Sequence, residues 1–183
     1  MAVLGLDDVY ESRGVVKVEA GGTDRLLSRE AAVALVARLR ADDRTIVFTN
    51  GVFDLLHPGH VRYLEHARSL GNVLIVGLNG DASVQRNKGK GKPIIPQLER
   101  AELLLALCSV DAVVVFDEDT PAEIIAAIEP DILVKGADWA ADRIVGRDTV
   151  ESRHGRVVRV PIEAGHSTTA LVERVRRSVT ADP

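Results

Sequence analysis

The chain has 183 residues, of which 46% are hydrophobic and 3% aromatic, with a net charge of −4. This composition predicts one domain with a substantial buried core and argues against nucleic acid as the main partner. Because the sequence has neither an apolar run of about 18 residues nor a signal-peptide pattern, we expect no membrane association. The single cysteine, Cys108, lies in an apolar run, which predicts a buried thiol, no internal disulfide and a reducing, cytoplasmic compartment.

The first 44 residues are predicted to form an N-terminal extension that carries one docking helix. Residues 1–27 give weak signals, among which Val15 to Val18 is a candidate strand. Ser28 is a suitable N-cap for a helix that ends near Arg40. Within this helix the apolar residues recur at helical spacing and form one stripe for burial, namely Ala32, Leu35, Val36 and Leu39.

Residues 45–179 are predicted to form the main domain, because short apolar strands alternate with helices from Thr45 onward. The expected strands are residues 45–49, 73–78, 112–116, 132–134 and 157–160. The expected helices are residues 60–70 and 96–107, one starting at Thr120 and Pro121, and a last one from residues 167–169 to about 179. This order predicts an α/β fold with a Rossmann-like parallel sheet and helices on both faces. Ligands bind such sheets at the carboxyl ends of the strands.

The most informative segment is TNGVFDLLHPGH, residues 49–60, which we call the signature segment. It follows a buried strand and ends where a helix begins, and a helix N-terminus offers free N–H groups and partial positive charge to phosphate. The imidazoles of His57 and His60 can donate to oxygens that gain charge during displacement at phosphorus. The alternatives are a chance surface pair or a structural zinc site, but no other histidine or cysteine has zinc-ligand spacing to this pair.

A cationic segment follows, in which Lys88, Lys90 and Lys92 are separated by glycines. We call residues 88–92 the lysine loop. Lysines on a glycine-rich loop can close over a triphosphate and neutralise its charge. The alternative is a solvated surface loop.

Two further segments are expected at the ligand-binding edge of the sheet. Residues 135–139 leave the carboxyl end of an expected strand, so their side chains should face the crevice, although Trp139 can instead pack at the edge of the core. Ser167, Thr168 and Thr169 begin the last expected helix, where hydroxyl and N–H groups can bind an anion, cap the helix, or do both.

Three charged residues have less specific patterns. Asp54 can orient the signature segment by accepting backbone hydrogen bonds, and Asp81 is a candidate cap for a helix after the second strand. Arg100 follows Glu99 on the next helix, which is typical of a surface ion pair of small value.

These motifs resemble the HxGH nucleotidyltransferase superfamily, which includes the cytidylyltransferases, and within it the branch of heptose 1-phosphate adenylyltransferases. The resemblance extends from about Thr45 to Arg176. The segments that carry it are the signature segment, NGDASV (79–84), KGKGKPI (88–94), ER (99–100), FDEDTP (116–121), PDILVKGADW (130–139) and STT (167–169). It implies the HxGH nucleotidyltransferase fold.

The resemblance also implies roles for individual residues. The catalytic residues would be His57, His60 and Lys88. The residues expected to contact the nucleotide are Thr49, Asn50, Gly51, Phe53, Gly59, Arg100, Lys135, Gly136, Ser167, Thr168 and Thr169. Those expected to contact the second substrate are Asp54, Asp138 and Trp139. No metal ligand from the protein is implied, and Mg²⁺ is expected to arrive with ATP.

The implied activity is transfer of an adenylyl group from ATP to D-glycero-β-D-manno-heptose 1-phosphate, which gives ADP-heptose and pyrophosphate. One alternative is a cytidylyltransferase acting on glycerol 3-phosphate or another polyol or sugar phosphate, and another is a non-catalytic nucleotide-sensing module. The expected partners are therefore ATP and a sugar phosphate, without nucleic acid or membrane. A homodimer is compatible with the resemblance.

Overall fold

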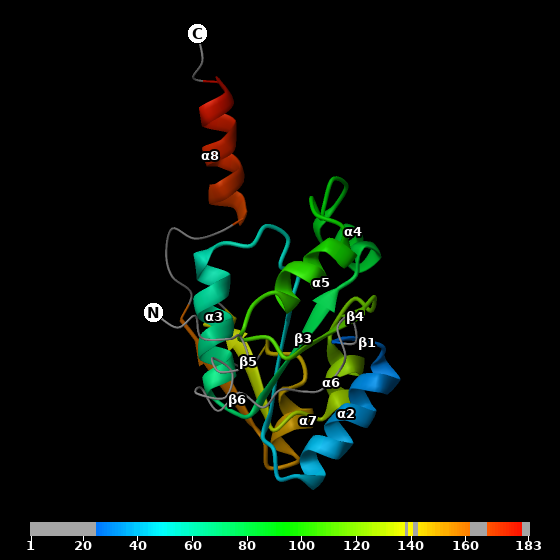
Figure 1. Ribbon diagram of the computed structural model, residues 1–183. Coiled ribbons are helices and arrows are strands. Elements are labelled where there is room, and N and C mark those ends of the chain that lie inside the picture. Colours follow the sequence, from blue (N-terminus) through cyan, green and yellow to red (C-terminus); the bar gives the residue numbers. More distant parts are fainter. Residues whose placement is uncertain (1–24, 138, 141–142, 162–167, 181–183) are drawn as a thin grey trace, which may run out of the picture.

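A single parallel sheet organises the fold. The computed structural model describes residues 25–137, 139–140, 143–161 and 168–180. Within these ranges six strands, each parallel to its neighbours, form one sheet in the order β1-β4-β3-β2-β5-β6 (Figure 1). The α/β fold with a parallel sheet that the sequence predicts is confirmed.

The central strands are buried because helices cover both sides of them. β2 (Ile46–Gly51) pairs with β3 (Val73–Asn79) on one side and with β5 (Ile132–Gly136) on the other. β4 (Ala112–Phe116) continues the sheet beyond β3, and β6 (Arg156–Val160) lies outside β5. Residues 46–49 and 73–78 are all buried, which explains their near-continuous apolar sequence.

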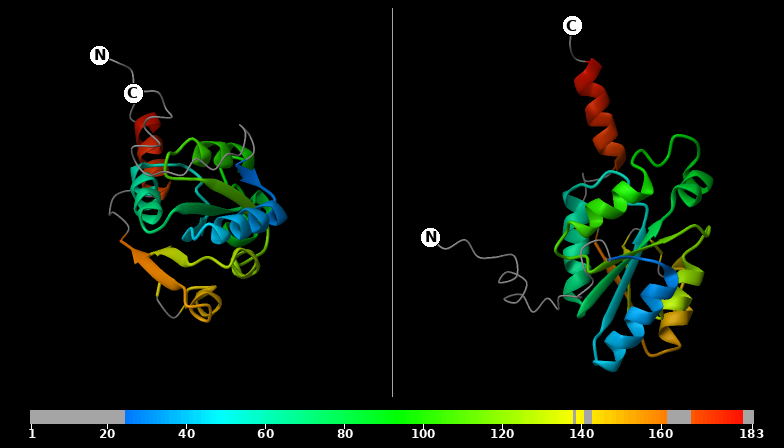
Figure 2. Two further views of the ribbon diagram at one scale, coloured as in Figure 1. Left: turned by 60° about the horizontal axis from the view of Figure 1, so that its bottom comes forward. Right: turned by 45° about the vertical axis from the view of Figure 1, so that its right-hand side comes forward.

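Two hydrophobic cores lie on opposite faces of the sheet. Helices cover both faces (Figure 2). On one face pack α2 (Arg29–Ala41), α6 (Ala122–Ile128) and α7 (Arg147–Glu151). On the other face pack α3 (Pro58–Ser69) and α5 (Gln97–Leu105). Phe48 belongs to the first core and Val47 to the second, because successive side chains of a strand point to opposite faces.

The N-terminal helix forms as its sequence predicts. Ser28 is the N-cap of α2, and its side-chain oxygen accepts a hydrogen bond from the backbone N–H of Ala31 at 3.2 Å. The predicted stripe is buried against the sheet. After β3 the chain forms α4 (Asp81–Lys88), but its N-cap is Gly80 rather than Asp81.

Two short elements were not predicted. β1 (Leu26–Leu27) pairs with β4, and α7 covers the first core. Two and five residues are too few to show a hydrophobic period. Because β1 joins the sheet, the described part of the N-terminal extension, residues 25–44, shares the core of the main domain. The candidate strand at residues 15–18 lies outside the described residues.

The prediction of a buried Cys108 is wrong, because this residue is exposed. α5 ends at Leu105, and the chain then turns before β4, with Val110 N–H donating to the carbonyl of Leu107. Cys108 lies on the outside of this turn, so the apolar run does not mark a continuous buried segment.

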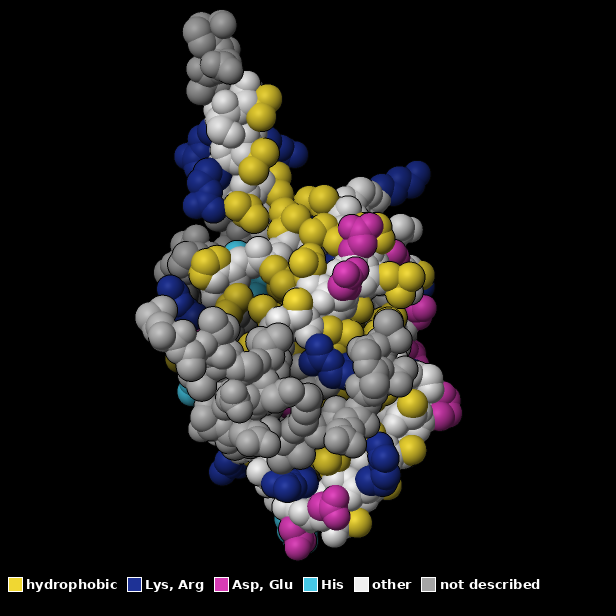
Figure 3. All heavy atoms as spheres, in the orientation of Figure 1, with side chains coloured by type: hydrophobic (Ala, Val, Ile, Leu, Met, Phe, Trp, Pro, Cys, Tyr) yellow, Lys and Arg dark blue, Asp and Glu magenta, His cyan; other side chains and the backbone are white. Residues whose placement is uncertain are grey.

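The last helix, α8 (Thr168–Thr180), projects from the body on the side where the strands end (Figures 1 and 2). A hydrophobic stripe follows one side of it and continues onto the body (Figure 3). Val175 and Val179 are 55% and 73% exposed. Within the described part of the chain, the helices are all too short or too polar to span a bilayer.

We expect Ser28→Ala to lower the free energy of unfolding by about 1 kcal/mol, because α2 loses the acceptor for its Ala31 N–H group. Ser28→Asp keeps an acceptor and should remain within about 0.5 kcal/mol of the wild type. Urea unfolding of the three proteins measures the difference. Equal stability of Ser28→Ala and the wild type would show that this cap does not stabilise the fold.

Candidate active site

A cavity of about 740 Å³ lies at the carboxyl edge of the sheet, by the ends of β2 and β5. From β2 the chain passes to β3 and β4 on one side, and only then returns to β5 on the other. This reversal opens a crevice at the strand ends, where α/β sheets bind ligands. Its walls include residues 50–54, His60, Tyr63, Asn79, Asn87, Lys88, Lys92, Asp119, Lys135, Gly136, Trp139 and Thr168.

The signature segment leaves β2 in a sharp turn. Phe53 has a φ of 46°, which lies in the left-handed region that residues with a Cβ seldom adopt. Its buried ring packs edge-on against His60, with the ring centroids 5.3 Å apart. A Cβ at Gly51 would lie 3.0 Å from the Phe53 ring. The glycine therefore leaves room for the ring to fold back, and the turn brings backbone atoms to the cavity wall.

The two histidines stand together at the start of α3. His57 is the N-cap, and the rings of His57 and His60 stack with centroids 3.8 Å apart and an interplanar angle of 17°. Burial, and secondarily the neighbouring His57, lowers the pKa of His60 to about 4, so this imidazole is neutral at pH 7. A neutral imidazole still carries one N–H donor. His60 lines the cavity, where it can donate to a phosphate oxygen.

Lys135 is a buried amine at the end of β5. Its Nζ donates to the side-chain oxygen of Asn50 at the end of the neighbouring strand β2. Burial lowers the pKa of Lys135 to about 8. Because this partner is an uncharged amide, a bound phosphate would supply the opposite charge that stabilises the ammonium form.

The lysine loop forms another part of the wall. Lys88 is the last residue of α4, and both Lys88 and Lys92 line the cavity. Gly89 and Gly91 have φ angles of 88° and 84°, and a Cβ at either position would meet nothing within 4 Å. The loop therefore extends into open space beside the cavity.

Asp54 accepts backbone hydrogen bonds as predicted, but from a different loop. Its buried carboxylate accepts from the N–H groups of Ile94 and Ile95 at 2.8 and 2.9 Å, and Lys92 Nζ lies 3.5 Å away. Asp54 therefore binds the exit of the lysine loop rather than orienting its own segment. Asp54 is predicted to contact the second substrate, but its carboxylate already binds the N–H groups of Ile94 and Ile95 and the Lys92 amine.

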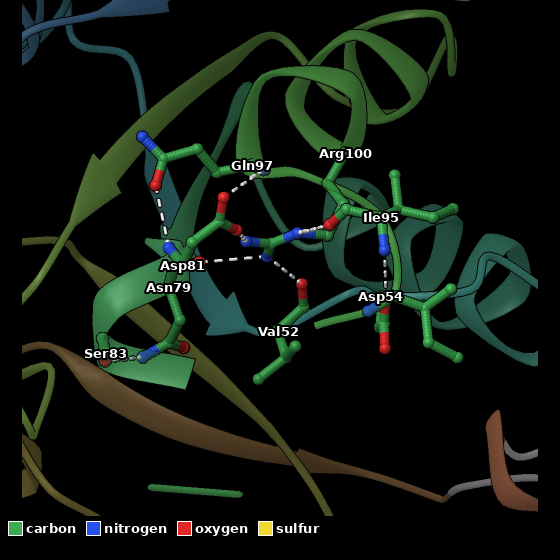
Figure 4. Close-up of polar contacts among 9 residues, drawn as sticks. Val52, Asp54, Asn79, Asp81, Ser83, Ile95, Gln97 and Arg100 are labelled. Carbon is green, nitrogen blue, oxygen red and sulfur yellow. Dashed lines mark hydrogen bonds and ion pairs between the residues drawn. The ribbon is translucent and has the colours of Figure 1, made fainter. Parts of the chain in front are cut away.

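The prediction that Arg100 contacts phosphate is corrected by the structure, and so is its interpretation as a surface ion pair. The side chain is fully buried on α5, and its guanidinium donates to the carbonyls of Val52, Asn79 and Ile95 and to the carboxylate of Asp81 (Figure 4). Since these partners engage all three of its nitrogens, Arg100 shapes the wall from behind.

Thr49 also lies beneath the cavity instead of in its wall. It is fully buried, its hydroxyl donates to the carbonyl of Val134 at 3.0 Å, and it shares a hydrogen bond of 2.7 Å with the hydroxyl of Tyr63. The Thr49 side chain is predicted to contact the nucleotide. In the structure it instead joins β2 to β5 and α3.

The other predicted site residues divide into three groups. Those in the cavity wall are Asn50, Gly51, Phe53, His60, Lys88, Lys135, Gly136, Trp139 and Thr168. His57 and Gly59 lie beside the wall at the start of α3. Asp138 and Ser167 lie outside the described residues, as does the side chain of Thr169.

The predicted site omitted several wall residues, among them Asn79, Tyr63 and Asn87. Asn79 ends β3 and donates to the hydroxyl of Ser83, while Tyr63 and Asn87 face the cavity from α3 and α4. Asn79 could have been found from its place at the carboxyl end of a strand. Tyr63 could have been found because it lies three residues after His60 on the same helix face.

A parallel sheet whose switch point holds a histidine pair, lysines and a helix N-terminus defines an α/β nucleotidyltransferase. Comparison with known proteins agrees. The cytidylyltransferase-like family model matches residues 48–174, and the chain belongs to this family.

Curated relatives match over most of this chain. The chain is 47% identical over 174 residues to the bifunctional protein HldE of Syntrophotalea carbinolica, and the matched region covers 95% of this chain and 35% of that protein. It is 52% identical over 153 residues to the bifunctional protein HldE of Hyphomonas neptunium, and here the matched region covers 84% of this chain and 32% of that protein. The chain thus spans about a third of the length of these relatives.

Two solved structures of other proteins share this fold. A lipopolysaccharide core biosynthesis protein from Thermoplasma volcanium matches with a TM-score of 0.55 and 32% identity, over 66% of this chain and 97% of that one. Pantoate-beta-alanine ligase from Francisella tularensis matches with a TM-score of 0.56, over 86% of this chain and 80% of that one. At 14% identity, the second match shows the fold alone.

We expect the affinity for ATP to fall as the pH rises from about 7 to about 9. With a pKa of about 8, Lys135 is mostly charged below this range and mostly neutral above it, and phosphate binds the charged form better. Kd should rise by up to about tenfold, and Lys135→Met should remove this dependence. Fluorescence of Trp139, the only tryptophan of the chain and a wall residue, can report binding. Wild-type pH dependence in Lys135→Met would assign the titration to another group.

Proposed function

We propose that this chain is an adenylyltransferase that joins ATP and D-glycero-β-D-manno-heptose 1-phosphate to give ADP-heptose and pyrophosphate. The observation that carries this proposal is the convergence of four separate motifs on one cavity, through His60, Lys88, Lys135 and Thr168. These motifs are the ones that resemble the heptose 1-phosphate adenylyltransferase branch. The similarity to the HldE proteins and to a lipopolysaccharide core biosynthesis protein supports a role in carbohydrate metabolism.

The proposed reaction needs room for two substrates. A phosphate oxygen of the sugar phosphate attacks the α-phosphorus of ATP, the new P–O bond forms, and the bond to the leaving pyrophosphate breaks. The cavity of about 740 Å³ falls within the usual range for small-molecule sites, about 300 to 1,000 Å³. The attacking phosphate monoester is already an anion at neutral pH, so the reaction requires no general base.

Catalysis then depends on positioning and on neutralising charge. His57 and His60 would donate hydrogen bonds to the phosphate oxygens at the start of α3, where the helix dipole adds partial positive charge. Lys88 and Lys92 would neutralise the leaving pyrophosphate. Lys135 would hold a phosphate group at the end of β5.

Magnesium is proposed to enter with ATP. Among the residues that the structure describes, no three His, Cys, Asp or Glu side chains come together to hold a metal ion. The Asp54 carboxylate, moreover, is already engaged by backbone N–H groups. Mg²⁺ usually keeps several waters and binds substrate phosphates. The described side chains therefore suit an ion that is bound to ATP better than an ion that is held by the protein alone. When bound, the ion would shield the charge of the triphosphate.

Pyrophosphate release tests the substrate assignment. ATP, CTP, GTP and UTP are each combined with the heptose 1-phosphate, glycerol 3-phosphate and glucose 1-phosphate. We expect the highest kcat/KM for ATP with the heptose phosphate. Preference for CTP with glycerol 3-phosphate would replace this function by a cytidylyltransferase. Tight ATP binding without turnover on any acceptor would instead favour a nucleotide sensor.

Replacing either signature histidine by alanine should lower kcat by about 100-fold, because one preorganised donor to the developing charge is lost. Steady-state kinetics of His57→Ala and His60→Ala measure this effect. His66→Ala, at an exposed position of the same helix α3, is the matched control and should retain wild-type kinetics. A histidine whose removal leaves kcat nearly normal would have no part in the proposed mechanism.

A further inference from the structure

Arg100 is a buried positive charge that joins three segments around the cavity (Figure 4). Its Nε donates to the carbonyl of Ile95 at 2.9 Å, and its Nη1 donates to the carbonyls of Val52 and Asn79. Val52 belongs to the signature segment and Asn79 ends β3, and both line the cavity. Ile95 lies just after the lysine loop. One guanidinium therefore fixes the relative positions of these three segments.

Asp81 and Gln97 hold this guanidinium in place. Asp81 Oδ1 accepts from Arg100 Nη2 at 2.7 Å, and Asp81 Oδ2 accepts from the backbone N–H of Gln97 at 3.2 Å. The Gln97 side chain accepts in turn from the backbone N–H of Asp81 at 2.8 Å. This closed set of hydrogen bonds joins the first residues of α4 and α5, the helices on either side of the lysine loop.

Asp54 holds the exit of the lysine loop from the other side. Its Oδ1 accepts from the N–H groups of Ile94 and Ile95, so the residue Ile95 is bound at its N–H by Asp54 and at its carbonyl by Arg100. Upstream of this doubly held residue, Gly89 and Gly91 lie in open space with positive φ angles. The exit of the loop is thus anchored, whereas its glycines offer conformational freedom.

We propose that Asp54 and Arg100 are positioning residues that together anchor the lysine loop to the signature segment, so that Lys88 and Lys92 face the triphosphate. This inference rests on the proposed function, since it assigns these lysines to ATP. It replaces the expected contacts of Asp54 with the sugar phosphate and of Arg100 with phosphate. Both residues act through the backbone that they bind, and neither touches the reacting atoms.

The anchor has a consequence that separates it from a substrate contact. Loss of the Asp54 acceptor releases the Ile94 and Ile95 N–H groups, and the loop then samples positions away from the cavity. ATP binding should weaken, whereas binding of the sugar phosphate should hardly change. A carboxylate that contacts the sugar would give the opposite pattern.

The test compares Asp54→Ala, Asp54→Asn and Arg100→Lys in the full chain. Asp54→Ala should raise KM for ATP by about tenfold and leave KM for the sugar phosphate within about twofold. Asp54→Asn keeps a carbonyl oxygen for the two N–H groups and should restore KM for ATP to within about threefold. Arg100→Lys keeps the charge but loses the planar fork, so it should resemble Asp54→Ala.

Trypsin provides a readout that needs no second substrate. Cleavage after Lys88 and Lys90 should be about tenfold faster in Asp54→Ala than in the wild type, and ATP should protect the wild type more strongly. Lys92 precedes Pro93, where trypsin does not cut, so the cleavage sites report on the free part of the loop. Unchanged cleavage in a folded Asp54→Ala protein would overturn the proposal.

Arg68→Lys is the matched control, because it makes the same change at another arginine, 13% exposed, that pairs with an aspartate. Arg68 pairs with the buried Asp111 at 2.8 Å, and Asp111 also accepts from the N–H of Leu74 near the start of β3, at the opposite end of the sheet from the cavity. Arg68→Lys should lower the melting temperature without changing KM for ATP or loop cleavage. Identical behaviour of the Arg100 and Arg68 variants would reduce Arg100 to a stabilising residue and overturn its part of the proposal.

The failure of this inference can be distinguished from failure of the proposed function. If the wild type transfers no adenylyl group, ATP binding by Trp139 fluorescence and loop cleavage still compare the variants. A rise in KM for the sugar phosphate alone, with normal loop cleavage, would return Asp54 to the substrate site and leave the adenylyltransferase assignment intact.

Discussion

The architecture of this protein depends on the parallel pairing of β2 with β3 on one side and β5 on the other. Because the chain passes to opposite sides of β2, the loops that follow β2 and β5 diverge and leave a crevice at the strand ends. The signature segment begins in the last residues of β2, and Lys135 and Gly136 end β5. This single constraint explains why motifs separated by about 80 residues in the sequence meet at one cavity.

The electrostatics of the cavity suit an anionic ligand. His60 is neutral at pH 7, and burial brings the pKa of Lys135 down to about 8. Both shifts have the same main cause, which is removal of the charged form from water. A phosphate group would reverse that effect by supplying the missing counter-charge. We therefore expect His60 and Lys135 to bind an anion by donated hydrogen bonds and by a positive charge that the anion itself stabilises, while Lys88 and Lys92 add two more basic side chains to the cavity wall.

The buried polar network behind the cavity shows how a strongly basic residue can hold the cavity wall together without lining the cavity. Arg100 is fully buried, yet it donates to three backbone carbonyls and one carboxylate. Burying a charge is unfavourable unless its hydrogen bonds are satisfied in this way. The same requirement fixes the geometry of every segment that supplies an acceptor, so the network gives the wall a defined shape.

The sequence by itself determined the fold class, the strands at residues 112–116 and 132–134, the capped helix after Ser28 and the place of the signature segment between a buried strand and a helix N-terminus. These features depend on local patterns: apolar runs, helical spacing and residues with fixed turn or cap preferences. The strand β1 and the helix α7 could not be predicted, because two and five residues are too few to show a hydrophobic period. The turn that exposes Cys108 could not be predicted either, because it lies within an apolar run that has no turn-forming residue pattern.

Only the tertiary structure decided what each polar side chain does. Arg100, Asp54 and Thr49 stand in motifs that point to ligand binding, but their actual partners are backbone groups or side chains that lie far away in the sequence. A sequence pattern records which residues occur and how they are spaced. It does not record which distant donor or acceptor packing brings within about 3 Å. The choice between a ligand contact and a buried structural bond is therefore made by the fold.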